Sequence, residues 1–231
     1  MAGSEEPLKI EGFDVCGLLG SGASSLVFAV ADESGRDLAL KLLARREDDS
    51  LLRSEFGRLS RLDHPNLIRV HDIGRTTTEL SFAGRRFDAN TLYIVMDRVS
   101  GRPADDYYRE NKGEPDLLQT AWDLASAVEY MHSRGLLHHD IKPQNLLVRD
   151  SGKATLIDLG LATRAEASFG ARGTLAFMAP EALVGGGDQR ADLYGIGATL
   201  FALAAKTPPF AEGTGAAVVE AIVAQPVMRR F

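Results

Sequence analysis

Cysteine is nearly absent from this sequence. Cys16 is the only one among 231 residues, so the chain cannot form a disulfide with itself, and a reducing compartment such as the cytoplasm is the expected setting. We expect Cys16 to be a small core residue. The first ten residues, MAGSEEPLKI, lack the apolar core of a signal peptide, which predicts that the chain is not exported by that route.

An excess of basic charge and a long apolar run are also missing. The 26 basic residues are outnumbered by 32 acidic ones, and the net charge of -6 argues against a general nucleic-acid-binding protein. The longest apolar stretch, residues 196–205, is far shorter than the roughly 20 residues that a membrane helix needs. We therefore expect no membrane insertion, and residues 193–205, which are apolar nearly all round, are predicted to form a buried helix.

The first hundred residues alternate apolar segments with turn-forming residues. An antiparallel meander is predicted, with strands over residues 13–19, 26–30 and 38–43, and two further strands over residues 67–73 and 92–95 are predicted on either side of a polar loop. A helix is predicted from about Ser50 to Leu62, with Leu52 and Leu59 on its apolar face. Glu55 lies on that same face, where an unpaired carboxylate is unfavourable, so the helix predicts a cationic partner beneath it.

The pattern becomes helical after Gly101. Asp116 and Gln119 resemble a capping box in front of an apolar series that runs from Leu117 to Met131. Together the two halves predict an α+β chain whose second half is mainly helix.

Two features of the strand-rich part suggest phosphate binding. Gly20, Ser21 and Gly22 form a glycine-rich turn between strands, where backbone N–H groups can approach phosphate oxygens; an ordinary hairpin loop is the alternative. Lys41 stands inside an apolar strand and either reaches to solvent or pairs with Glu55. The pair would satisfy both charges and hold the ammonium against the α- and β-phosphates of a nucleotide.

The densest group of chemically active residues lies between residues 136 and 160. Asp140, Lys142 and Asn145 lie in the segment LLHHDIKPQNLLV, and Asp158 follows in IDLG. Carboxylate and amide oxygens without a cluster of cysteine and histidine suit Mg²⁺ rather than zinc. Each acid taken singly is as well explained as a solvated loop charge, whereas the ordered set is hard to obtain by chance.

From Gly20 to at least Phe210, these motifs resemble the protein kinase superfamily. The resemblance implies catalytic roles for Asp140, Lys142, Lys41 and Glu55, and Mg²⁺ binding by Asn145 and Asp158. Asp140 would orient the acceptor hydroxyl and take its proton, and Lys142 would neutralise the transferring group. Asp192 in the segment RADLYG would brace the backbone of the loop that carries Asp140.

The same resemblance implies a binding site for ATP. Met96 would limit the back of the adenine pocket, and the backbone from Asp97 to Val99 would form hydrogen bonds with the adenine. The residues expected around the nucleotide are Leu19, Gly20, Ser21, Gly22, Val27, Ala39, Lys41, Met96, Asp97, Val99 and Leu147. Specificity for serine and threonine rests on Lys142, two residues after Asp140, and on Thr174, which precedes the segment Ala179-Pro180-Glu181.

The sequence departs from the family pattern beside Asp140. His139 replaces an arginine that normally reads a phosphate on the activation segment, so we expect activity to depend only weakly on phosphorylation there. Thr163 and Ser168 are candidate phosphorylation sites, equally well explained as solvated loop residues. Leu159 keeps the apolar character of the usual phenylalanine.

A second departure concerns the C-terminal end. The family usually continues for a few more helices beyond the position of Phe231, one of which supplies an arginine partner for the glutamate that matches Glu181. We therefore expect a C-terminal part that is trimmed, part of a longer protein or truncated.

The predicted fold is α+β and two-lobed, with ATP in the cleft. Residues 1–97 are expected to form a small antiparallel β lobe with one helix, and residues 98–231 a larger helical lobe that is incomplete. The predicted function is a serine/threonine protein kinase that acts on protein substrates, with further domains in a longer parent chain as an open possibility. The alternatives are a pseudokinase or ATP-binding scaffold, favoured by His139 and the early C-terminal end, and a small-molecule phosphotransferase of similar fold.

Overall fold

The computed structural model describes residues 9–22, 25–43, 56–82, 84–111, 115–159, 175–184, 188–210 and 215–224. The chain divides into two compact units, which are described separately below. The first comprises Met1–Leu62 and Arg69–Arg98, and the second comprises Asp63–Ile68 and Val99–Phe231.

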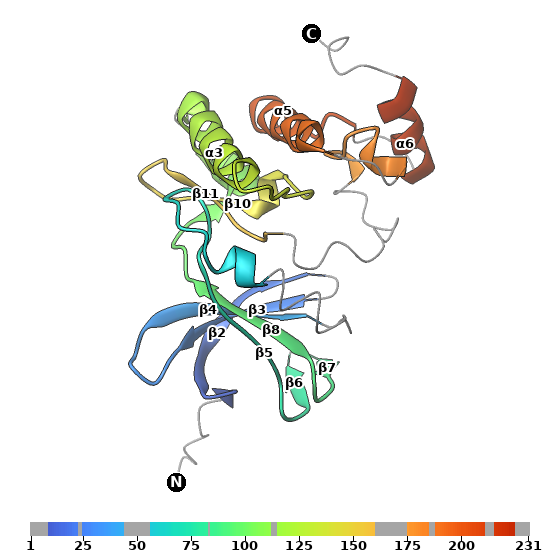
Figure 1. The fold of residues 1–231 in the computed structure, drawn as a ribbon. Coiled ribbons are helices and arrows are strands. Elements are labelled where there is room, and N and C mark those ends of the chain that lie inside the picture. The colour runs from blue at the N-terminus through green and yellow to red at the C-terminus, as the bar shows by residue number, and fades with distance from the viewer. Residues whose placement is uncertain are drawn as a thin grey trace. The chain divides into compact units, whose positions relative to one another are not determined.

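An antiparallel sheet dominates the first unit (Figure 1). Its strand order is β1-β2-β3-β4-β8-β5. The strands are β1 (Lys9–Ile10), β2 (Phe13–Ser21), β3 (Ser25–Ala31), β4 (Asp37–Leu43), β5 (Val70–Arg75) and β8 (Leu92–Asp97). The predicted meander of β2, β3 and β4 is confirmed, and of the two further predicted strands β8 pairs with β4 while β5, which begins only at Val70, pairs with β8. Leu67, expected in that strand, instead forms an isolated parallel bridge with Leu156 in the second unit.

One face of this sheet carries the hydrophobic core of the first unit. Because side chains alternate along a strand, Phe28 of β3 and Leu40 of β4 point to this face, and both are fully buried. A separate hairpin of β6 (Leu80–Phe82) and β7 (Arg85–Phe87) packs on the same core. The ring of Phe82 meets that of Phe28 edge-on at 4.8 Å, and Phe87 is 2% exposed.

The prediction that Cys16 is a core residue is wrong. Its side chain is exposed. The register between β2 and β3 shifts twice, between Val15 and Gly17 and between Leu18 and Gly20, so the simple alternation along β2 is interrupted. Of the predicted helix over residues 50–62, residues 50–55 lie outside the described residues, and residues 56–59 are helical.

The second unit is mainly helical (Figure 1). Its helices are α2 (Ala104–Glu110), α3 (Leu117–His132), α5 (Gln189–Ala205) and α6 (Gly215–Ala224), with the 3-10 turns η1 (Pro143–Asn145) and η2 (Ala182–Val184). A small sheet has the order β11-β10-β9, from β9 (Arg102–Pro103), β10 (Leu146–Val148) and β11 (Ala154–Leu156). The fold is thus α+β, as predicted.

Helix α3 begins where the sequence predicted. The side chain of Asp116 accepts a hydrogen bond of 2.9 Å from the backbone N–H of Gln119, which is one half of a capping box. The Gln119 side chain donates forward to Asp123 at 2.8 Å.

Helix α5 is buried on one side only, so the prediction of burial all round is wrong. Gly195, Ala198 and Ala202 are buried, whereas 57% of Leu193 is exposed. Within the described part of the chain, no helix is long and apolar enough to span a membrane.

Candidate functional site

Strand pairing in the first unit groups four of the residues expected around the nucleotide. Val27 of β3 lies opposite Lys41 of β4, and Ala39 of β4 lies opposite Met96 of β8. Directly paired residues share a face of the sheet. Lys41 and Ala39 alternate with the core residue Leu40, so all four lie on the face opposite the hydrophobic core.

Gly20 and Ser21, predicted in the glycine-rich turn, instead end β2 opposite Val27 and Leu26. The turn from β2 to β3 begins at Gly22 and is anchored by a residue that sequence reasoning missed. Gly22 N–H donates to the carbonyl of Ser25 at 2.9 Å. The guanidinium of Arg85, on β7, donates to the carbonyls of both Gly22, at 2.7 Å, and Ser25, at 3.1 Å. One side chain therefore holds both ends of the turn, from 60 or more positions along the chain.

The other residues predicted around the nucleotide belong to both units, and each unit is described by itself. Leu19 is 47% exposed, and the Asp97 side chain meets Nε2 of His71 at 2.6 Å. The N–H of Asp97 donates to the carbonyl of Arg69 at 2.9 Å. Val99 and Leu147 are half-buried residues of the second unit. Glu55 lies outside the described residues, so its pairing with Lys41 stays a prediction.

The loop of residues 138–145 gathers the predicted catalytic side chains of the second unit. Nζ of Lys142 lies 2.7 Å from Oδ2 of Asp140. Nδ2 of Asn145 donates to the same oxygen at 2.9 Å and to the Asp140 carbonyl at 2.8 Å. Only 13% of the Asp140 side chain and 19% of the Lys142 side chain are exposed. The carboxylate is therefore held in one orientation by a cation and an amide.

This 138–145 loop is fastened to α5 by Asp192. Oδ1 accepts a hydrogen bond of 2.8 Å from His139 N–H, and Oδ2 accepts one of 2.9 Å from His138 N–H. Nε2 of His132, at the end of α3, lies 2.8 Å from Oδ2. Asp192 is 2% exposed, so these contacts replace water around a buried carboxylate. The predicted bracing role of Asp192 is confirmed, and His132 is an additional partner that the sequence did not indicate.

His138 links the backbone of Asp140, the predicted catalytic acid, to the backbone beside Asp158, the predicted metal-binding acid. Its Nδ1 accepts from Asp140 N–H, and its Nε2 faces the carbonyl of Ile157, both at 3.3 Å. This pattern fits the neutral tautomer with the proton on Nε2. Complete burial lowers the pKa of His138, although Asp192 and Asp158 act in the opposite direction. The imidazole therefore stays neutral and joins the residues next to Asp140 and Asp158.

Asp158 is positioned by the antiparallel pairing of β10 with β11. Leu146 lies opposite Leu156, and Ile157 N–H donates to the Asn145 carbonyl at 2.8 Å. Asn145 and Asp158 therefore lie at the same end of this ribbon. Asp158 and His139 have φ angles of 61° and 63°, in the left-handed region that side chains other than glycine rarely adopt.

A glycine of α5 lets the helix pack directly on the 138–145 loop. A Cβ added to Gly195 would lie 3.1 Å from Cβ of Ile141 and 3.4 Å from its carbonyl oxygen. Ile141 stands between Asp140 and Lys142. The absence of a side chain at Gly195 thus sets how closely the helix approaches these residues, a constraint that the sequence motif did not reveal.

Comparison with known proteins identifies the family. The family model of the protein kinase domain matches residues 13–230. The serine/threonine-protein kinase PknJ of Mycobacterium tuberculosis is 36% identical over 224 residues, which cover 90% of this chain and 36% of PknJ. The DNA damage-responsive serine/threonine-protein kinase RqkA of Deinococcus radiodurans is 34% identical over 229 residues, covering 93% of this chain and 33% of RqkA.

A plant relative shows a comparable similarity. The CBL-interacting protein kinase 29 of Oryza sativa subsp. japonica is 35% identical over 221 residues, which cover 86% of this chain and 47% of that protein. The chain spans less than half the length of these three relatives. Because the family model covers nearly all of the chain, and because its fold and the 138–145 loop agree with it, this chain belongs to the protein kinase family.

Proposed function

We propose that this chain is a catalytically active serine/threonine protein kinase core, which transfers the γ-phosphoryl group of ATP to hydroxyl groups of protein substrates. The arrangement around Asp140 carries the proposal. A cation and an amide contact one carboxylate oxygen, on a loop fastened to a buried acid. Phosphoryl transfer depends mainly on positioning and charge stabilisation, and this arrangement supplies both. An ATP-binding scaffold without turnover would have no need of it.

Asp140 is proposed as the residue that forms a hydrogen bond with the hydroxyl group of the substrate. Its carboxylate would orient the hydroxyl and accept its proton as the bond to phosphorus forms. Lys142, 2.7 Å away, would place a positive charge beside the transferring group. Neither residue needs a large movement for these roles, because both side chains are already held by the 138–145 loop.

Asn145 and Asp158 are proposed to hold Mg²⁺. Nδ2 of Asn145 is engaged by Asp140, which identifies Oδ1 as the amide atom suited to a metal. One carboxylate and one amide oxygen fit Mg²⁺, which keeps several water ligands. When bound, Mg²⁺ would neutralise charge on the phosphates.

The nucleotide is proposed to contact both parts of the chain, residues 1–97 and 98–231. Gly20–Gly22 would approach its phosphates, and Lys41, paired with Glu55, would bind them. Any contact of Asp97 with the adenine would run through its carbonyl, because its N–H already donates to Arg69. The remaining contacts are proposed for Leu19, Val27, Ala39, Met96, Val99 and Leu147. A reducing compartment such as the cytoplasm fits the single cysteine.

The test is incubation of the chain with labelled ATP, Mg²⁺ and a generic protein, followed by phosphoamino-acid analysis. We expect phosphoserine or phosphothreonine from the natural sequence. Asp158→Asn should lower turnover at least about 1000-fold, since one metal-binding charge is lost. Asp150→Asn is the matched control, because this acid has 99% of its side chain exposed.

Three outcomes would contradict the proposal. ATP binding without any transfer would support the pseudokinase alternative. Labelling of small molecules but not of protein would support the phosphotransferase alternative. Full activity of Asp158→Asn would remove the proposed metal role.

A further inference from the structure

Asp97 is joined to the neighbouring strand by a side-chain contact that has no role in the phosphoryl transfer proposed above. Its Oδ1 lies 2.6 Å from Nε2 of His71, a residue of β5. An ionised carboxylate only accepts hydrogen bonds, so Nε2 of His71 is the donor. Hydrogen bonds to a charged group are shorter and stronger than those between neutral groups. The contact therefore holds Asp97 at the end of β8, where the backbone is proposed to meet the adenine.

A β-bulge places His71 beside the end of β8. Val70 lies opposite Met96, and Asp72, two positions later, lies opposite the adjacent Val95. His71 is therefore the extra residue of β5. Such a bulge interrupts the alternation of side chains along a strand and redirects one of them. The contact with β8 thus depends on an irregularity of the sheet and not on ordinary strand pairing.

His71 is the more enclosed partner in this contact. Its side chain is 20% exposed, whereas that of Asp97 is 51% exposed. The imidazole thus has a fixed place within the sheet, and the carboxylate would turn more freely in solvent without it. The N–H of Asp97 also donates to the carbonyl of Arg69 at 2.9 Å. With its side chain and its N–H both held, Asp97 presents its carbonyl in one orientation.

We propose that His71 is a positioning residue for the nucleotide, which fixes the Asp97 carbonyl by holding the Asp97 side chain and so selects adenine over guanine. The proposal rests on the nucleotide site proposed above. Adenine carries an amino group where guanine carries a carbonyl oxygen, so a fixed acceptor favours adenine. A site built to bind one hydrogen-bonding group discriminates against the analogue that lacks it.

The experiment measures the dissociation constants of Mg-ADP and Mg-GDP for the 231-residue chain and its variants by titration calorimetry, which requires no phosphoryl transfer. His71→Ala should weaken ADP binding about fivefold, as expected for the loss of one hydrogen bond of about 1 kcal/mol. GDP binding should change less than about twofold, because guanine gains nothing from this acceptor. The preference for ADP over GDP should therefore fall.

A conservative variant separates the hydrogen bond from the packing of the side chain. In glutamine the amide nitrogen is separated from Cα by the same number of bonds as Nε2 in histidine. His71→Gln should therefore keep a donor for Asp97 and restore ADP binding to within about twofold of the natural value.

A double-mutant cycle tests whether the effect runs through the contact itself. Asp97→Ala should weaken ADP binding by the same factor as His71→Ala. The double variant should show that factor once, a loss of about fivefold, because each single substitution already breaks the contact. Independent effects would instead multiply to a loss of about 25-fold.

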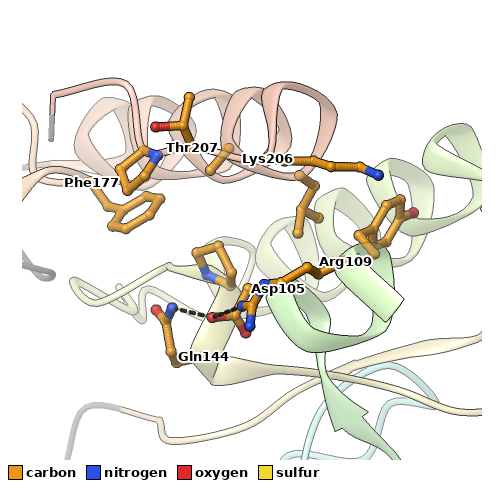
Figure 2. Close-up of a pocket in the computed structure, with 11 residues that line it drawn as sticks. Asp105, Arg109, Gln144, Phe177, Lys206 and Thr207 are labelled. Atoms are coloured by element: carbon orange, nitrogen blue, oxygen red, sulfur yellow. Dashed lines mark hydrogen bonds and ion pairs between the residues drawn. The ribbon is translucent and has the colours of Figure 1, made fainter. Parts of the chain in front are cut away.

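Two controls remove comparable contacts elsewhere. Asp37→Ala breaks the ion pair of 2.8 Å with Arg98, the residue that follows Asp97. Asp105→Ala removes the hydrogen bond of 2.7 Å from Gln144 in the second unit, which Figure 2 shows as a dashed line. Both variants should keep the two dissociation constants within about twofold of the natural values.

Several results would overturn the proposal. These are unchanged ADP binding by His71→Ala, equal losses for ADP and GDP, and a loss of about 25-fold in the double variant. Binding of ADP without any phosphoryl transfer would contradict the proposed catalytic function alone. If the natural chain bound neither nucleotide, the proposed nucleotide site and the role of His71 would both be wrong.

Discussion

The two units hold their candidate site residues in different ways. In the first unit, Val27, Lys41, Ala39 and Met96 share a face because strand register places them there. Many backbone hydrogen bonds fix that register, and no single side chain determines it. In the second unit, the 138–145 loop depends on one buried carboxylate, that of Asp192. A single substitution should therefore be far more damaging in the second unit than in the first.

The largest effect is expected from Asp192→Asn. An asparagine would direct its NH₂ group at an N–H or imidazole that needs an acceptor, so at least one buried donor would lose its partner. We expect a loss of more than about 3 kcal/mol in the free energy of unfolding and of at least about 100-fold in kcat. Urea unfolding and steady-state kinetics measure both.

Asp188→Asn is the control for that substitution. Asp188 caps the same helix through Arg190 N–H at 2.8 Å, and asparagine is an equally good N-cap. Its exposed position predicts little change in either measurement. Comparable losses in the two variants would contradict the special role of Asp192.

A smaller effect is expected from Gly195→Ala. The added methyl group would press on Ile141 at 3.1 Å and shift Asp140 or Lys142, so kcat should fall about tenfold. Gly197→Ala, on the same helix, meets nothing within 4 Å and should stabilise the chain by about 0.5–1 kcal/mol through helix propensity. Equal kcat values for the two variants would show that the close approach has no catalytic consequence.

Arg85→Ala tests the first unit, where the comparison predicts a weaker response. Loss of the hydrogen bonds to Gly22 and Ser25 should loosen the glycine-rich turn and raise KM for ATP about fivefold with kcat nearly unchanged. Arg86→Ala is the control, because it removes the same charge from the same strand. Arg86 pairs with Glu79 instead of with the turn. A fall in kcat with KM unchanged would contradict a positioning role for Arg85.

The smallest effect is expected from pH. Burial lowers the pKa values of His138 and His64, both in the second unit. Below about pH 6.5 the unfolded chain therefore binds more protons than the folded chain. Stability should be complete above that pH and should decrease as the pH falls from about 6.5 toward the folded pKa values. Urea unfolding across this range measures the loss, and His138→Asn should make it shallower; an unchanged slope would exclude His138 as a cause.

Much of the fold could be predicted from local pattern. Short apolar segments separated by turn-forming residues predicted β3, β4 and β8 to within a few positions, and Asp116 marked the start of α3. The predictions failed where burial depends on neighbours. Cys16 on β2 is exposed, and so is Leu193 on α5, a helix that is buried on one face only.

The sequence alone determined which chemical groups are present and how they are spaced: Asp140, Lys142 and Asn145 on one loop, and Asp158 after the two short strands that follow it. Short spacing makes such groups neighbours whatever surrounds them. Only the tertiary structure decided which residues position the site. Asp192 and Gly195 contact the 138–145 loop and Arg85 contacts the turn after β2, in each case from more than 50 positions away. Contacts of that kind depend on how elements pack, and no local pattern records them.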